Sequence, residues 1–288
     1  MTRGIDHLVI NVRRLEAAVS RYKALGFTIT PRAVHPFGTA NHLVQLRGNF
    51  LELVTVVNDA AIVPPKVGQF SFGAFCRNYQ EKRDGMSMLV FHSDDARADQ
   101  AEFISSGLNT YAPFDFSRKA TLPDGSQVTV GFSLAFVTHP AMPEAAFFCC
   151  QQHAPQHFWR EEYQTHPNGA EFVSKVYMVA DKPASLQGFF RAMHSADNVL
   201  LRGDELRIRT ALGQISVIRP ADFLNRFPRA HVVGAPTTPH FAGFQVKVVS
   251  LDRVKQILKT NSVVFMQRSA SVYVRPTHAF GLVIEFRQ

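Results

Sequence analysis

Two side chains near the start of the chain, His7 and Glu52, are of types and in positions that could do chemistry. His7 lies in the alternating stretch GIDHLVINV and shares one face of it with Ile5, Val9 and Asn11, and Glu52 interrupts the apolar run NFLELV. A carboxylate inside a buried strand is costly unless it is paired or bound to a metal. One imidazole and one carboxylate suit a divalent ion such as Zn, Fe, Mn, Ni or Co. The alternatives are a hydrogen-bonded core histidine and a solvent-facing glutamate.

The elements that would position these residues follow an order that repeats. The first stretch predicts a strand, the segment RRLEAAVSRYKALGF predicts a helix that ends at Gly26, and strands follow at FTITPRAV, ANHLVQLRG and NFLELVTVV. The same order begins again near residues 86, 171 and 241. Four units imply two pairs, which we divide into residues 1–166 and 167–288 at the HPNG turn. A connecting helix that begins at Pro64-Pro65 is expected between the first two units.

Composition narrows the classes of partner. The 288 residues carry 31 Lys and Arg against 23 Asp and Glu. No basic block is longer than two residues, which argues against a nucleic-acid-binding protein. The excess of positive charge is equally compatible with an anionic small-molecule ligand. No apolar run approaches the roughly 18–20 residues of a membrane-spanning helix, and no signal peptide is evident. Three cysteines cannot all pair, and two of them are adjacent, a position from which a disulfide forms only with difficulty. We therefore expect a cytoplasmic protein that binds neither membrane nor nucleic acid.

The stretches GIDHLVINVRRLEAAVSRYKALGF, HPFGTANHLVQL, NFLELV and FFCCQQHAPQHFWREEYQTHPNGA together resemble the vicinal oxygen chelate superfamily, and within it the glyoxalase-like domain proteins. The resemblance covers the first domain well, and the second only in element order. It implies an α+β fold in which tandem βαβββ modules pair into half-open barrels, with two such domains in this chain. It also implies a divalent metal on the barrel floor, and His7 and Glu52 stand at its first-strand and fourth-strand positions.

The second unit departs from the superfamily pattern. Met88 stands where the first unit has His7, and His92 lies four residues farther along, roughly 13 Å at strand rise. In the closing strand Cys149, Gln151 and His153 share one face, and His153 is the preferred third ligand, with Gln151 second. The expected metal set is His7, Glu52 and His153. A slip of one residue would turn His153 away from the cavity and present Gln152 instead.

The turn before the third strand supplies candidate substrate contacts. In HPFGTANHL, Gly38 permits a turn, and Phe37, Asn41 and His42 would lie near the cavity mouth. The alternative is a plain turn with a surface histidine. Gln151 completes the predicted substrate-binding set, and Trp159 is expected to pack in the core.

The second pair of units offers little chemistry. Lys175 and Ser216 stand at the positions that match His7 and Glu52, and Gln245 and Glu285 are placed to pair in the fourth unit without partner histidines. We expect a degenerate, structural module, or one that forms a homodimer.

These residues favour a divalent-metal-dependent enzyme of the lyase, isomerase or dioxygenase type that acts on a small, oxygen-chelating substrate, and the excess of basic residues is compatible with an anionic one. Glu52 would be a ligand, a base or both. The alternative is a protein that binds or sequesters a small molecule with no metal, as the phenylalanine-rich strands of the second unit would allow. Metal content distinguishes the two.

Overall fold

The computed structural model describes residues 3–121, 126–232 and 234–288. The first half contains, in chain order, β1 (Ile5–Asn11), α1 (Leu15–Ala24), β2 (Ala33–Val34), β3 (Thr39–Gln45), β4 (Phe50–Val56), η1 (Asp59–Ala61), α2 (Phe72–Lys82), β5 (Gly85–Ser93), α3 (Ala96–Ser105), β6 (Asn109–Thr110), β7 (Phe114–Thr121), β8 (Gln127–Thr138), β9 (Ala146–Gln152), α4 (Pro155–Phe158) and α5 (Glu161–Gln164). The second half contains β10 (Ala170–Val179), η2 (Pro183–Leu186), α6 (Gln187–Met193), η3 (Ala196–Asn198), β11 (Val199–Arg202), β12 (Glu205–Arg209), β13 (Gln214–Ile218), α7 (Pro220–Arg226), β14 (His240–Val248), α8 (Leu251–Thr260), β15 (Met266–Gln267), β16 (Ser271–Val274), η4 (Pro276–His278) and β17 (Val283–Arg287).

The described strands form two mixed sheets of matching design. The first has the order β2-β3-β4-β1-β5-β9-β8-β6, with β7 paired to β8, and the second has the order β11-β12-β13-β10-β14-β17-β16-β15. In each sheet the first strand of a unit runs parallel to the last strand of that unit, and the two first strands run antiparallel to each other. The predicted α+β fold of paired βαβββ modules is confirmed. The predicted division between residues 166 and 167 falls in the segment that joins the two sheets.

Local signals explain where the helices begin and end. Asp95 caps α3 by accepting hydrogen bonds from the backbone of Arg97 and Ala98, and Ser250 caps α8 in the same way. Helix α2 begins at Phe72, not at the expected Pro64-Pro65, because the Ser71 side chain accepts a hydrogen bond from the Ala74 backbone and so satisfies a free donor of the first turn. None of the helices in the described ranges is long and apolar enough to cross a membrane.

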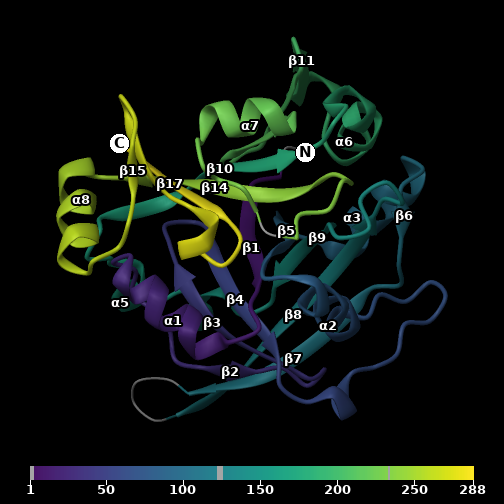
Figure 1. The fold of residues 1–288 in the computed structure, drawn as a ribbon. Helices are drawn as coiled ribbons and strands as arrows, with labels where there is room; N and C mark the ends of the chain where they lie inside the picture. The colour runs from purple at the N-terminus through teal and green to yellow at the C-terminus, as the bar shows by residue number, and fades with distance from the viewer. Residues whose placement is uncertain (1–2, 122–125, 233) are drawn as a thin grey trace.

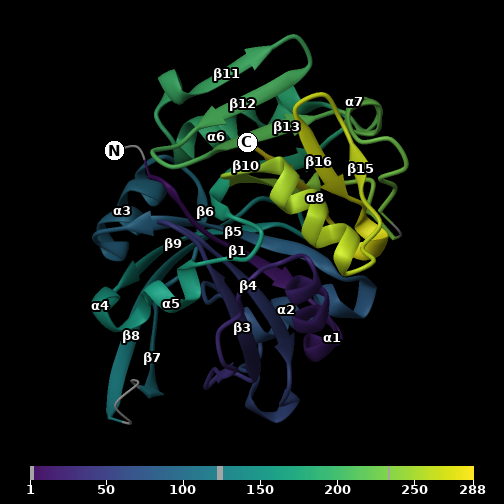
Figure 2. The same ribbon diagram turned by 90° about the vertical axis from the view of Figure 1, so that its left-hand side faces the viewer.

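The two sheets pack back to back around one shared apolar core. Phe147 of β9 meets Phe189 and Phe190 of α6 at ring-centroid distances of 5.1 and 5.8 Å, and Phe241 of β14 at 5.6 Å. Figure 1 shows β10 and β14 crossing above β1 and β5. The other face of the first sheet curls, and Figure 2 shows β3 and β4 descending on one side and β7 and β8 on the other. A separate apolar cluster lines that inner face.

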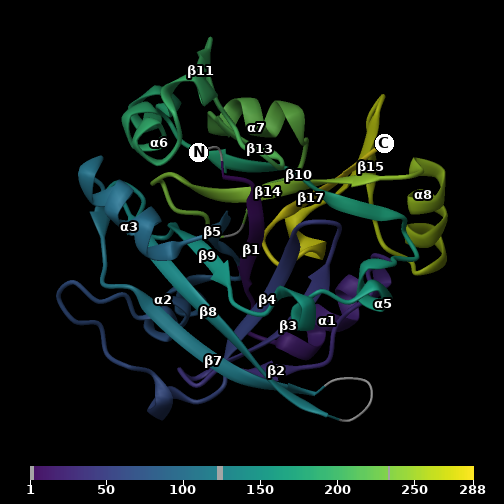
Figure 3. The ribbon, with the colours of Figure 1, turned by 180° about the vertical axis from the view of Figure 1, so that it is seen from behind.

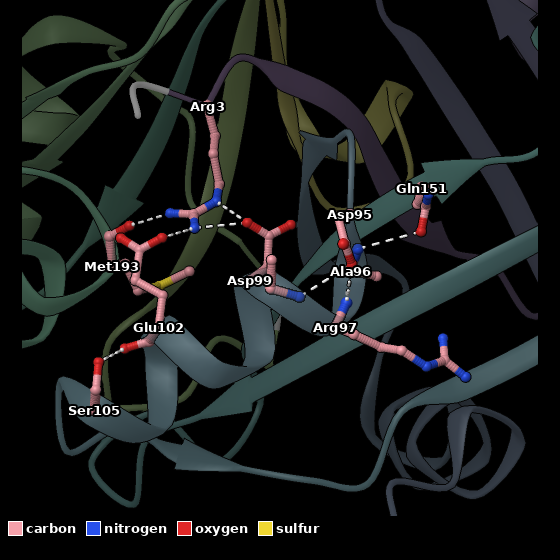
Figure 4. A network of polar contacts seen from close by, with 10 residues as sticks. Arg3, Asp95, Ala96, Arg97, Asp99, Glu102, Ser105, Gln151 and Met193 are labelled. Atoms are coloured by element: carbon pink, nitrogen blue, oxygen red, sulfur yellow. Dashed lines mark hydrogen bonds and ion pairs between the residues drawn. The ribbon is translucent and has the colours of Figure 1, made fainter.

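A buried arginine adds polar contacts to this junction. Arg3 donates hydrogen bonds to the Asp99 carboxylate of α3 at 2.8 Å and to the Met193 carbonyl at the end of α6 at 3.0 Å, and it also contacts Glu102 (Figure 4). His194 follows directly. Both of its ring nitrogens are buried and have no hydrogen-bond partner among the residues that the structure describes, and its ring lies 4.8 Å from that of Phe91.

His194 predicts a loss of stability in acid. Burial, followed by the charge of Arg3, lowers the pKa of His194 from 6.5 to about 4. Between pH 6.5 and pH 4 the unfolded chain therefore binds a proton at this histidine and the folded chain does not. The folded state keeps its full stability above pH 6.5 and loses stability as the pH falls toward 4. The predicted loss is about 3 kcal/mol in the free energy of unfolding. Denaturant titrations across this range should show it, and His194→Leu should flatten the dependence, whereas replacing the exposed His231 with leucine should not. An unchanged slope in His194→Leu would contradict the prediction.

Candidate functional site

A cavity lies on the curled inner face of the first sheet. Its walls are mostly aromatic, and its polar members come from β1, β3, β4, β7 and the turn before β3. The lining residues are His7, His35, Phe37, Asn41, Leu43, Phe50, Glu52, Phe72, Phe116, Arg118, Phe132, Leu134, Phe148, Cys150 and Phe158. Many of these lining residues lie two positions apart in the sequence, because alternate residues of a strand face the same side of a sheet.

His7 is held in a fixed orientation. Its Nδ1 lies 2.5 Å from Asp6 Oδ1, and its ring stacks on Phe50 with centroids 4.2 Å apart. A carboxylate can only accept, so the Nδ1 atom carries the proton in this contact, and Nε2 is left to face the cavity. The Nε2 atom lies 3.8 Å from Glu52 Oε2. The Asp6 side chain is itself buried, and its Oδ2 accepts a hydrogen bond from Gln152 at 3.3 Å.

Glu52 is buried and held by the neighbouring strand. Asn41 Nδ2 donates a hydrogen bond of 2.6 Å to Glu52 Oε1, which fixes the orientation of the Asn41 amide and leaves its buried Oδ1 without a partner among the described residues. An unpaired buried acceptor costs stability, and such departures from an optimal core are typical of functional sites. His35 Nε2 lies 3.8 Å from the same oxygen of Glu52. The two carboxylate oxygens of Glu52 thus face two imidazoles.

A tight turn places His35 and Phe37 at the cavity. Gly38 has a φ of +87°, and a Cβ atom there would lie 2.4 Å from the Asn58 carbonyl oxygen, so this turn requires glycine. His35 Nδ1 lies 2.8 Å from Thr39 Oγ1 across the turn. Burial lowers the pKa of His35, and the nearby charge of Arg118 lowers it further against the opposing effect of Glu52. His35 is therefore a neutral ring at pH 7.

The structure brings four of the predicted site residues together and turns others away. His7, Glu52, Phe37 and Asn41 all line the cavity. His42 points to the other side of β3, where its Nδ1 lies 2.7 Å from the Thr30 carbonyl oxygen.

The residues expected from β9 do not line the cavity. The Gln151 side chain reaches the start of α3, where it donates to the Asp94 carbonyl at 2.8 Å and accepts from the Ala96 backbone (Figure 4). His153 is exposed, and its Nε2 lies 2.8 Å from Ser133 Oγ. The even-numbered residues of β9 face inward: Phe148 and Cys150 line the cavity and Gln152 reaches Asp6. The structure thus has the one-residue alternative register, which separates His153 from His7 and Glu52.

The cavity's donor set fits a divalent metal poorly. His7, His35 and Glu52 offer suitable atoms but are not arranged as a metal-holding group, and the second unit adds only the thioether of Met88 and the thiol of Cys150 on the same side of the sheet. Burial, with the charges of Asp6 and Glu52, raises the pKa of Cys150 well above its usual value, so the thiolate that would bind a metal is disfavoured. Across residues 3–121, 126–232 and 234–288, no group of three or more His, Cys, Asp or Glu side chains is arranged to hold a metal ion.

The matching face of the second sheet is closed by its own chain. Phe223 of α7 and Phe227, which follows the helix, pack on Tyr177 with ring centroids 6.4 and 5.2 Å away. Figure 3 shows α7 on the side of the sheet that faces away from the first. Glu285 accepts hydrogen bonds from Tyr177 at 2.6 Å and from Gln245 at 2.7 Å. Burial raises the pKa of Glu285, but these donors and Ser271 outweigh it and hold the pKa below its ordinary value. Both oxygens of the Glu285 carboxylate therefore accept hydrogen bonds from the protein itself.

Sequence reasoning missed three polar residues of the site. Asp6 sits beside His7 at an irregularity in the pairing of β1 with β5, so it is not on the face that strict alternation assigns to it. His35 lies in a turn, where no periodicity applies. Arg118 could have been found, because it follows the aromatic residues Phe114 and Phe116 at a spacing of two in β7.

Comparisons with known proteins agree with this architecture. A family model described as a glyoxalase-like domain matches residues 5–193. No curated protein matches the chain.

Solved structures share the fold over nearly the whole chain. A hypothetical protein from Staphylococcus aureus has a TM-score of 0.65 at 12% identity, with 99% of each chain covered. A mutant of 4-hydroxymandelate synthase from Streptomyces coelicolor has a TM-score of 0.61 at 14% identity, covering 99% of this chain and 92% of that one. The Mn(II)-bound glyoxalase from Novosphingobium aromaticivorans has a TM-score of 0.58 at 12% identity, covering 99% and 82%. At these identities the likeness concerns the fold.

Proposed function

The chain belongs to the glyoxalase-like domain family, and from that premise we propose that it is an enzyme of the isomerase type that moves protons on a small carbonyl compound bound against the side chains of His7 and Glu52. One observation carries the proposal: a buried imidazole, oriented by Asp6 through Nδ1, directs Nε2 at a buried carboxylate 3.8 Å away inside an aromatic cavity. Two proton-accepting groups that lie side by side can each reach one of two adjacent atoms of a bound compound, which is what proton transfer between those atoms requires.

The proposed steps balance without an oxidant or reductant. For a hydroxyl group beside a carbonyl, Glu52 takes the proton from the carbon that bears the hydroxyl, and the electron pair moves toward the carbonyl to give an enediolate. His7 Nε2 moves the hydroxyl proton to the other oxygen, while Asp6 keeps the ring in the required tautomer. Glu52 then returns its proton to the neighbouring carbon. The carbonyl has moved by one carbon, and both residues are restored.

Asn41 and the aromatic walls have supporting roles in this proposal. Asn41 holds the Glu52 carboxylate by its 2.6 Å hydrogen bond, so the base does not have to be ordered when substrate binds. The phenylalanine rings exclude water, which strengthens charge interactions inside the cavity.

The proposal gives no step to a metal. The sequence favours a divalent metal, and one structural neighbour is a Mn(II)-bound glyoxalase, but His7, His35 and Glu52 are not arranged as a metal-holding group among the described residues. Removal and addition of divalent metal are therefore the first control in an activity assay. We expect activity to survive a strong chelator and to gain nothing from added Mn, Fe, Co, Ni or Zn.

A second candidate function is a small-molecule binding protein without catalysis. The aromatic lining favours it, since Phe37, Phe116 and Phe132 would hold an apolar ligand without any reaction. The two candidates predict the same binding and differ in what happens to the bound molecule.

Deuterium exchange distinguishes the two candidate functions before the substrate is known. The protein is incubated in D₂O with panels of 2-oxo acids, hydroxy ketones and hydroxy aldehydes, and the proton signal of the carbon next to each carbonyl is followed by NMR. An enzyme of the proposed type should remove that signal at least about 10²-fold faster than buffer for the compounds that it accepts. Binding without any accelerated exchange would contradict the proposed function and favour the binding protein.

A further inference from the structure

Arg118 is the cation of the cavity, and it lies at the cavity's outer end. It follows Phe116 on the inward face of β7, and both side chains line the cavity. Arg118 also lines a second, more open hollow that shares Asn41, Leu43 and Phe158 with the first. The two hollows therefore adjoin each other, and Arg118 borders both.

The charge of Arg118 has no partner of its own. Across the described ranges of the chain, no group accepts a hydrogen bond from its guanidinium or forms an ion pair with it. Burial lowers the pKa of Arg118, and the charge of Glu52 counteracts this from a distance. Arg118 is partly buried, and a guanidinium in such a place without a hydrogen-bonded anion is disfavoured, so a bound anion would supply the missing partner.

The outer hollow carries an excess of positive charge. Arg32, Arg118, Lys119 and Arg160 line it, against the single acid Glu162. Arg160 pairs with Glu162 at 2.8 Å, so the acid is already neutralised. A hollow lined by one sign of charge raises the local concentration of ligands of the opposite sign.

We propose that the substrate is an amphipathic carboxylate that enters through the outer hollow, and that Arg118 binds its carboxylate while its apolar body lies among the phenylalanines of the cavity. A carboxylate matches the planar guanidinium with two parallel hydrogen bonds. The inference rests on the proposed function only for the assignment of this cavity as the active site. It adds the substrate class, the residue that selects it and the route of entry.

The apolar surface beside Arg118 favours a ligand that carries an apolar group as well as a negative charge. Phe116 and Phe132 stack with centroids 5.0 Å apart beside Arg118, and Phe37 meets Phe116 edge-on at 5.2 Å. A small inorganic anion would pair with the guanidinium and leave these surfaces uncovered. An aryl or branched alkyl group next to the carboxylate would cover them.

The single tryptophan of the chain reports on the cavity. Trp159 lies 5.7 Å from the ring of Phe50 and 5.2 Å from that of Phe158, and both rings line the cavity. Fluorescence titrations with 3-phenylpropanoate, and with 3-phenylpropan-1-ol as an uncharged analogue of the same size, therefore measure binding. Wild type is compared with Arg118→Gln, with Arg118→Lys and with the control Lys66→Gln. The control removes the charge of an exposed lysine that lines neither hollow. Calorimetry confirms the stoichiometry.

The acid should bind wild type more tightly than the alcohol does. Arg118→Gln should weaken binding of the acid by roughly 10- to 100-fold and leave binding of the alcohol within about threefold. Arg118→Lys should fall between, and Lys66→Gln should change neither affinity by more than about threefold. The inference is overturned if Arg118→Gln binds the acid as wild type does, if Lys66→Gln loses as much affinity as Arg118→Gln, or if wild type shows no saturable preference for the acid up to about 10 mM. The melting temperature of each variant checks folding, and losing an unpaired charge should not lower that of Arg118→Gln.

The two proposals can fail separately. Accelerated exchange with uncharged carbonyl compounds, unaffected in Arg118→Gln, would overturn the role of Arg118 and leave the proposed function standing. Carboxylate binding that depends on Arg118, with no accelerated exchange of any compound, would overturn the proposed function and leave the role of Arg118 standing.

Discussion

Replacing Glu52 with glutamine is expected to slow deuterium exchange of an accepted carbonyl compound by about 10³-fold while leaving its binding within about threefold. Glutamine keeps the shape of glutamate but cannot take up a proton, so the step at carbon loses its base. Binding should persist because the apolar walls and Arg118 are unchanged. The exchange rate at saturating compound, followed by NMR, measures the first effect, and Trp159 fluorescence measures the second.

The second half of the chain supplies a matched control for this variant. Glu285 is also a buried glutamate on the closing strand of a unit, but it is hydrogen-bonded to Tyr177, Gln245 and Ser271. Glu285→Gln should therefore lower the free energy of unfolding and leave the exchange rate per folded molecule unchanged. Full exchange activity in Glu52→Gln would show that another group removes the proton, and equal losses in both variants would point to a general structural effect.

Phe147→Ala should lower the free energy of unfolding by about 3–5 kcal/mol and destabilise both sheets together. The Phe147 ring has no exposed surface, and it packs on Phe189, Phe190 and Phe241 from the second half. Removing it leaves a cavity inside the core that both sheets share. Urea titrations followed by Trp159 fluorescence, which reports on the first half, and by far-UV circular dichroism, which reports on both, should give coincident midpoints in wild type and in the variant.

Phe116→Ala is the control for loss of an aromatic ring. Phe116 is partly exposed and lines the ligand cavity, so its removal should cost markedly less stability than Phe147→Ala and should weaken ligand binding instead. Separate midpoints for the two probes would show that the halves unfold independently. A loss below about 1 kcal/mol in Phe147→Ala would show that the shared core does not couple them.

The repeated order of elements could be predicted because it depends on local signals. Each unit repeats an alternating strand, a helix and clear turns; in the first unit the helix is expected to end at Gly26. This repetition led to the predicted α+β arrangement of paired modules. The start of α2 was misplaced because a proline pair and a capping serine both occur before the helix, and only the hydrogen bond to Ser71 decides between them.

The candidate site was predictable where its residues lie on regular strands. His7, Glu52 and Asn41 follow the alternation of β1, β4 and β3, so their common face could be read from their spacing. His153 and Gln151 could not be placed in this way, because a shift of one residue in β9 exchanges the inward and outward faces. The pairing of β9 with β5 and β8 fixes that register and directs Cys150 and Gln152 inward.

By itself the sequence determined the order of the elements, the pairing of units and the two inward groups His7 and Glu52, because alternation and helical spacing are properties of neighbouring residues. Only the tertiary structure decided that Asp6 orients His7, that His35 and Arg118 join the cavity while His153 does not, and that α7 closes the second sheet. These depend on strand register, on a turn at Gly38 and on packing between distant segments. Such contacts join residues that lie far apart along the chain, and local pattern carries no record of them.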